Sequence, residues 1–328
     1  MSELVTLSDE LKDEEWLSEI EVIGDDRGYY EPVGKAHDAL FLDDSLEVLL
    51  VSFDTVASAR SGSAEGLPHA MVEANRHGWS HLSILAHGPS WFRDPNVYGY
   101  FDRLVDDAFF EDFDHVVFYG AGMCGYAAAA FSVAAPGATV IAVAPQATLD
   151  PAIAPWDDRF IGMRRTDFSS RYGYAPDMID AADRAFIVYD PTMELDAMHA
   201  SLFRGPQVHH IRYRHGGVHL GADLQAMGAM RPIFERAVTG TLKPVDFYRA
   251  LRLRHDYLPY LRNVLNRVHI EDRNWLTALL CRSVLTRANA PRFRHHLELS
   301  EHKLSAAGRR LPPPRRRLRA AERLPDIN

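Results

Sequence analysis

The chain has 328 residues, of which 47% are hydrophobic, so it can bury a large core; we expect one large domain with an appendage rather than several domains. The formal net charge of -9 argues against a body that binds nucleic acid generally. The two cysteines, Cys124 and Cys281, fit neither a disulfide framework nor a zinc-binding spacing, which suits a reducing compartment.

Charge is distributed unevenly along the chain. Residues 1–38 form an acidic N-terminal segment, whereas residues 308–328 form a basic tail rich in proline and arginine. We expect this tail to be a solvated end that contacts nucleic acid only weakly, through its charge. The start of the chain lacks a basic and apolar signal peptide, and no apolar run reaches the roughly 18–20 residues of a membrane helix. The expected location is cytoplasmic.

Strands and helices are predicted to alternate over the first 240 residues. A short helix from Asp9 to Ile20, capped by Ser8, is expected in the acidic segment. Buried strands are predicted at 46–53, 82–86, 115–119, 139–144, 185–189 and 207–213. Helices are predicted at 68–77, 97–110, 126–133, 194–203 and 221–238, and residues 54–68 are expected to form a loop.

The pattern divides the chain into four parts. After the acidic segment, residues 39–240 form an α/β core with an aromatic-rich insertion at about 147–184. Residues 241–307 read as a helical subdomain, and the basic tail follows. Alternating strands and helices predict a mainly parallel sheet covered by helices on both faces. Ligands of such sheets bind at the carboxyl ends of the strands, so any site should lie on that rim.

The stretch from His115 to Gln146 reads as strand, glycine turn, helix and strand, and it allows two interpretations. Gly120-Ala-Gly122-Met-Cys-Gly125 fits the G-x-G-x-x-G pattern that holds a dinucleotide pyrophosphate. The acidic residue that should end the next strand is missing, because that strand ends Ala144-Pro145-Gln146. The second interpretation is the nucleophile elbow of an α/β-hydrolase, a strained turn that lifts a nucleophile above the sheet.

The elbow interpretation is strengthened by a resemblance. Tyr119-Gly-Ala-Gly-Met-Cys-Gly-Tyr-Ala-Ala128, followed by Pro145-Gln146, resembles the Y-G-S-S-M-G-G-Y-A-A elbow of a bacterial α/β-hydrolase-like group over roughly residues 46–235. The resemblance implies an α/β-hydrolase-like fold and a setting in bacterial cell-surface or polysaccharide metabolism. It places Gly122 at the nucleophile position, where serine-type covalent catalysis is not available because glycine has no side chain.

The same resemblance implies positions for the partners of the nucleophile. The histidine corresponds to His219, and the acid to Asp190 or Asp196, with Asp196 at the closer spacing. Oxyanion donors would be the amide of Met123 and an amide near Asp54 or Thr55. Cys124 is an alternative nucleophile because a helix N-terminus can lower the pKa of a thiol; a small packed residue is the plainer interpretation.

Ser90 and a group of histidines are the remaining polar candidates. Ser90 lies on the expected rim and either donates hydrogen bonds to a ligand or caps a turn. Four histidines between His209 and His219 are not spaced to stack on one helical face, so no metal is predicted, and no cofactor is expected.

Two other stretches of the sequence are similar to a different group of proteins. The stretches Trp91-Phe92-Arg93-Asp94 and Arg171-Tyr-Gly-Tyr-Ala-Pro176 are similar to proteins catalogued as phosphoadenosine phosphosulfate reductase. Those enzymes resemble nucleotide-binding proteins with an S-G-G-x-D-S loop and a C-terminal C-G-x-H, and this chain contains neither pattern.

The sequence therefore predicts a degenerate or atypical α/β-hydrolase-like protein that binds a small molecule or a partner protein without serine-hydrolase chemistry. Two alternatives stay open. One is an active hydrolase or acyltransferase that uses Cys124 or another rim residue with His219 and Asp196. The other is a nucleotide-binding oxidoreductase.

Overall fold

The structure, a computed structural model, describes residues 6–8 and 10–313. The chain divides into two compact units, Met1–Tyr257 and Leu258–Asn328. The change in composition alone predicts this boundary near Gly240. The helix α10 (Pro244–Ala250) belongs to the first unit, where Phe247 packs on Phe186 of the sheet with ring centroids 5.0 Å apart.

The first unit is built on one eight-stranded sheet in the order β1-β2-β4-β3-β5-β6-β7-β8. The strands are β1 (Gly28–Pro32), β2 (His37–Leu42), β3 (Val48–Thr55), β4 (Ser80–Ala86), β5 (His115–Ala121), β6 (Thr139–Val143), β7 (Arg184–Tyr189) and β8 (Val208–Arg212). Strands β3 to β8 pair in parallel, and β2 runs antiparallel to both of its neighbours. The predicted mainly parallel α/β sheet is confirmed.

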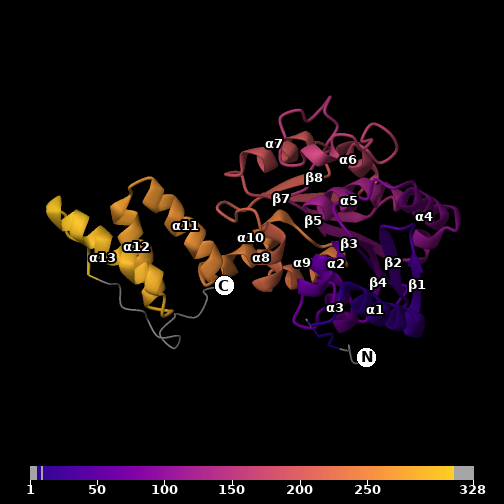
Figure 1. Cartoon of the computed structure of the whole chain (residues 1–328), viewed down its shortest axis with the longest axis horizontal. Helices are drawn as coiled ribbons and strands as arrows, with labels where there is room; N and C mark the ends of the chain where they lie inside the picture. Colours follow the sequence, from indigo (N-terminus) through magenta and orange to yellow (C-terminus); the bar gives the residue numbers. More distant parts are fainter. Residues whose placement is uncertain (1–5, 9, 314–328) are drawn as a thin grey trace. The chain divides into compact units, whose positions relative to one another are not determined.

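Helices cover both faces of this sheet, as Figure 1 shows. They are α1 (Asp13–Arg27), α2 (Val56–Ser61), α3 (His69–His77), α4 (Pro95–Asp106), α5 (Met123–Phe131), α6 (Ala175–Met178), α7 (Glu194–Leu202), α8 (Leu220–Ala226), α9 (Met230–Ala237) and α10. Alternate residues of the strands face opposite cores, as expected for a pleated sheet. Leu40 and Leu42 pack with α1 and α3, whereas Ala39 and Phe41 belong to the core under α4 and α5.

Two strands and several boundaries differ from the sequence prediction. The N-terminal helix begins at Asp13 and continues to Arg27; Asp9 lies outside the described residues. Strands β1 and β2 were missed because Gly28–Pro32 contains glycine, glutamate and proline, and His37–Leu42 contains no β-branched residue. The loop predicted at 54–68 contains α2. The predicted helix 221–238 is two helices, because the chain turns at Gly228 with φ +69°.

The second unit is helical. It contains α11 (Leu258–Ile270), α12 (Asn274–Leu285) and α13 (Pro291–Ala306), so the C-terminal helical region is present. Cys281 is buried in α12, and burial raises the pKa of its thiol to about 12. In the part of the chain that the structure describes, no helix combines the length and the apolar character needed to cross a bilayer.

Candidate functional site

The turn between β5 and α5, the position of the predicted elbow, is sharp and contains two glycines, Gly120 and Gly122. Gly122 sits at its apex with φ +60° and ψ −123°, a conformation that costs other residues strain. A Cβ built on Gly122 would meet no atom within 4 Å, so its apex is open. A Cβ on Gly120, by contrast, would lie 2.1 Å from the carbonyl oxygen of Cys124. Gly120 is therefore required for the helix to turn back on the strand.

The strand order and this turn decide the fold class. The chain has an α/β-hydrolase-like fold.

The two predicted oxyanion donors differ in their surroundings. Met123 is the first residue of α5, where amides lack intrahelical partners and the helix dipole favours negative charge. The amide of Thr55 donates to the Ser58 hydroxyl at 2.8 Å, and the Thr55 hydroxyl oxygen accepts the Ser58 amide at 3.0 Å. These two bonds cap α2. The Thr55 amide is thus engaged by its own helix.

Cys124 does not have the surroundings of a reactive thiol. Its side chain is buried in the first turn of α5, and it belongs to the apolar core. Burial and the nearby Asp54 carboxyl raise the pKa of the thiol well above its ordinary value, whereas the Thr55 amide acts in the opposite direction. The thiolate is the nucleophilic form of cysteine, so at neutral pH this site holds the unreactive thiol.

A buried polar network that the sequence did not reveal lies beside the elbow. The Ser52 hydroxyl lies 3.3 Å from Asp54 Oδ2 and 3.0 Å from His81 Nε2. Burial raises the pKa of Asp54 to about 7, against the lowering effect of hydrogen bonds from Ser52 and Ser58. Burial lowers the pKa of His81 to about 3. At neutral pH His81 is therefore uncharged, and Asp54 is only partly ionised.

The structure brings Asp190, rather than Asp196, to the loop that carries His219. Asp190 Oδ2 accepts the amide of Gly217 at 3.0 Å, two residues before the histidine. His219 is exposed and directly precedes α8. The neighbouring Gly221 lies against the elbow, where a Cβ would come within 2.5 Å of the Ala121 side chain.

Asp196 lies on α7 and contacts the aromatic-rich insertion instead. Its Oδ1 pairs with Arg159 at 2.6 Å, and Arg159 also binds Asp157. Asp157 in turn lies 2.9 Å from Nε2 of the fully buried His199. This cluster joins the insertion to α7. Among the described residues no group of three or more His, Cys, Asp or Glu side chains is arranged to hold a metal ion.

Two cavities of the first unit differ in their relation to the elbow. One, of about 460 Å³, lies between the loop of residues 61–65, α3 and α8. Its lining includes the charged side chains of Glu65, Glu73, Arg76, Asp223 and Arg231, and also His69 and Tyr257. Gln225 of the same wall donates to the Tyr119 hydroxyl at 3.0 Å, which connects the cavity to β5.

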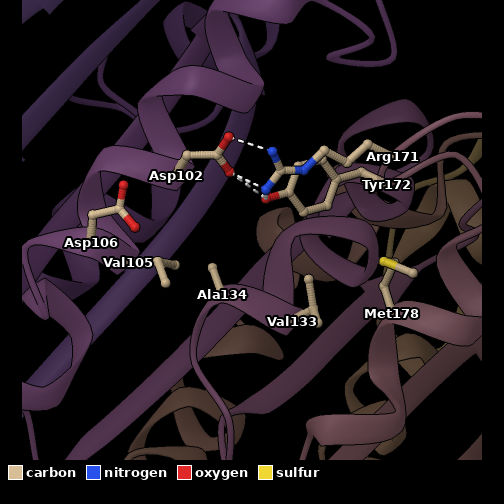
Figure 2. A pocket seen from close by; sticks show the side chains of 8 residues that line it. All are labelled: Asp102, Val105, Asp106, Val133, Ala134, Arg171, Tyr172 and Met178. Carbon is tan, nitrogen blue, oxygen red and sulfur yellow. Dashed lines mark hydrogen bonds and ion pairs between the residues drawn. The ribbon is translucent and has the colours of Figure 1, made fainter.

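The other cavity, of about 600 Å³, is drawn in Figure 2. Arg171 and the Tyr172 hydroxyl both bind the Asp102 carboxylate there. Val133 and Ala134 of its lining follow the C-terminal end of α5, about 15 Å along the helix from the elbow. This cavity is therefore remote from the predicted rim.

Comparisons with known proteins give structural likeness only. No protein-family description and no curated protein matches the chain. A hyperthermophilic esterase from the archaeon Pyrobaculum calidifontis is similar at 13% identity and a TM-score of 0.43, over 72% of this chain and 93% of the esterase. The capsule O-acetyltransferase of Neisseria meningitidis serogroup A is similar at 13% identity and a TM-score of 0.40, over 62% of this chain and 92% of that enzyme. Scores this low carry no argument about activity.

Proposed function

We propose that this chain is an α/β-hydrolase-like protein that binds a small molecule or a partner at the sheet rim and performs no serine-hydrolase chemistry at its elbow. The observation that carries the proposal is Gly122, which has the strained backbone and the open space of a nucleophile position. Glycine offers no atom that can attack an acyl carbon. The elbow then supplies only amides and the positive end of α5.

The neighbouring residues support this proposal. The buried Cys124 thiol, with its raised pKa, does not replace the missing hydroxyl. Asp196 is paired with Arg159, so the alternative that joins Cys124, His219 and Asp196 lacks its acid. The nucleotide-binding alternative is weakened by the segment that follows β6, Ala144-Pro145-Gln146, which lacks the acidic residue that would bind a ribose hydroxyl.

The cavity beside α8 is the ligand site in this proposal. Glu73 is buried and pairs with both Arg76 and Arg231, so the wall presents fixed charges of both signs. The Asp223 carboxylate accepts the Tyr257 hydroxyl at 2.9 Å on the opposite wall. Such a lining suits a small polar molecule with both donors and acceptors.

A fluorophosphonate probe, with the adduct located by peptide mass spectrometry, tests the inactive elbow. We expect no adduct on residues 119–128 of the unaltered protein, and no change in labelling for Cys124→Ala. Gly122→Ser should gain an adduct at residue 122, because the strain costs only about 1–3 kcal/mol and no atom blocks the new side chain.

Gly122→Ala is the matched control, since it carries the same strain without a hydroxyl. An adduct on Cys124 in the unaltered protein, or ester turnover that disappears in Cys124→Ala, would contradict the proposal.

A further inference from the structure

A serine, a histidine and an aspartate lie in a row on the sheet rim, on the β4 side of the elbow. Ser90 Oγ is 2.7 Å from Nε2 of His37. On the other side of the same ring, Nδ1 lies 3.6 Å from Oδ2 of Asp94. Ser90 is partly exposed, whereas His37 is 1% exposed. The hydroxyl therefore lies at the surface and the imidazole lies behind it.

The surrounding hydrogen bonds determine the direction of proton transfer. Nδ1 of His37 is buried, and no hydrogen-bond partner for it is found among the described residues. The Asp94 carboxylate favours a proton on this nitrogen, which leaves Nε2 as the acceptor for the Ser90 hydroxyl. Ser90 Oγ also accepts the amide of Phe92 at 3.1 Å, so its own proton is directed to His37. At 3.6 Å the Asp94 carboxylate is beyond hydrogen-bond distance of Nδ1 in this structure, and such catalytic contacts often tighten only when the substrate binds.

The turn that carries Ser90 is strained and rigidly supported. The next two residues, Trp91 and Phe92, have φ angles of +49° and +55°, a region that bulky side chains rarely adopt. Both aromatic side chains are buried. The Trp91 indole donates to Gln146 at 3.1 Å, and the Phe92 ring packs on His37 and Phe53. Strain retained by such packing is concentrated at functional sites.

This row of residues does not depend on the elbow. His37 begins β2 opposite Ala86 at the end of β4, so Ser90 follows the same edge of the sheet as Gly122. One strand, β3, separates β4 from β5, so the ends of these two strands lie about 10 Å apart across the sheet. Asp94 also caps α4 through its other oxygen, which accepts the Asn96 amide at 2.8 Å. The helix cap thus holds the carboxylate beside the histidine.

We propose that Ser90 is a nucleophile for acyl esters, with His37 as its general base and Asp94 as the residue that positions His37. Ser90 Oγ forms a bond to the ester carbonyl carbon while its proton passes to His37 Nε2. The bond to the alcohol oxygen then breaks, and His37 returns the proton to the departing alcohol. Water, deprotonated by His37, attacks the acyl-serine, releases the carboxylic acid and regenerates the Ser90 hydroxyl.

The full chain is tested with a fluorophosphonate probe and with p-nitrophenyl acetate. We expect the adduct on Ser90 in the unaltered protein and none in Ser90→Ala. His37→Gln should lower the labelling rate about 100-fold, the scale of general-base assistance. Ser169→Ala is the matched control: Ser169 is exposed and bonds a carboxylate, Asp167, without a histidine, and labelling should not change.

Asp94→Asn tests the positioning role, because asparagine retains an oxygen for the α4 cap but removes the charge. Burial lowers the pKa of His37, and Asp94 and Asp38 oppose this effect whereas His87 adds to it. Loss of the Asp94 charge should lower the pKa of His37 further. The fall in labelling rate at acid pH, which marks protonation of His37, should then occur at a lower pH. If Asp94 only caps α4 and does not act on His37, the pH at which labelling falls should be the same in Asp94→Asn and in the unaltered protein.

The position of the adduct separates this inference from the proposed inactive elbow. A protein that is never labelled on Ser90, or a folded Ser90→Ala that is still labelled at the same rate, would overturn the inference. An adduct on the elbow would contradict the proposed function instead. If Ser90→Ala does not fold, the position of the adduct in the unaltered protein still shows whether Ser90 is the nucleophile.

Discussion

Single residues decide what the elbow can do. Gly120 and Gly122 look equivalent in the sequence, yet a Cβ on the first would collide with backbone and a Cβ on the second would meet open space. The turn therefore needs glycine at residue 120 for packing, whereas residue 122 tolerates a side chain at the expense of strain. Only the second position is one where a nucleophile would fit.

The raised pKa of the Asp54 carboxyl predicts that the free energy of unfolding depends on pH in an unusual way. Its pKa is raised to about 7 in the folded protein, so it contributes stability that is fully present below its unfolded pKa of about 4. This contribution is lost as the pH rises through about 7, with a slope of up to about 1.4 kcal/mol per pH unit. Urea denaturation between pH 4 and pH 8 measures it.

Asp54→Asn is the comparison that isolates this carboxyl, because His81 titrates in the opposite sense in the same network. The free energy of unfolding of the unaltered protein, minus that of Asp54→Asn, should increase as the pH falls from 8 to 4. A difference that is constant with pH would show that Asp54 ionises normally.

At the scale of elements, the insertion is joined to the core by a few buried polar contacts. Asp157 accepts hydrogen bonds from Arg159 and lies against the buried His199, whose Nδ1 accepts the Ala147 amide at 3.1 Å. Trp156 also packs on the His199 ring, with centroids 4.5 Å apart. The aromatic residues of the insertion thus pack on a polar anchor that connects it with α7.

Asp157→Ala should destabilise the protein by about 3 kcal/mol, because it leaves Arg159 and His199 without their buried partner. Urea denaturation gives this change, and limited proteolysis should show faster cleavage within residues 147–184. The neighbouring Asp158 is exposed, so Asp158→Ala should change stability by less than about 0.5 kcal/mol. Equal effects of the two substitutions would contradict the anchoring role.

At the scale of the whole molecule, the boundary of the α/β unit lies after Tyr257. Besides the packing of Phe247 on Phe186, Arg184 of β7 donates to the carbonyl oxygens of Gly240 and Leu242 at 2.6 and 3.2 Å. The segment after Gly240 therefore completes one face of the sheet. The division of the chain into four functional parts stays a prediction.

Two truncated chains test this boundary. Residues 1–257 should unfold cooperatively, whereas residues 1–240 should unfold at a lower urea concentration or aggregate, because Phe186 loses its cover. Circular dichroism during urea denaturation distinguishes them. Identical midpoints would place the boundary at Gly240, as the composition alone suggested.

The sequence by itself determined the mainly parallel sheet and the glycine turn between β5 and α5. These features are local: buried strands show as apolar runs, and glycines mark the turns. Strands β1 and β2 escaped detection because glycine, glutamate and proline interrupt β1 and no β-branched residue occurs in β2; the pairing of β2 with β4, and of β1 with β2, holds them in the sheet.

Only the tertiary structure decided which polar groups meet. Asp190 and Asp196 are six positions apart and equally acidic in sequence, yet one reaches the loop before His219 and the other reaches Arg159. Likewise, Ser90 and His37 are separated by 53 positions and become neighbours through the register of β2 and β4. Such pairings depend on non-local strand register, which local composition does not encode.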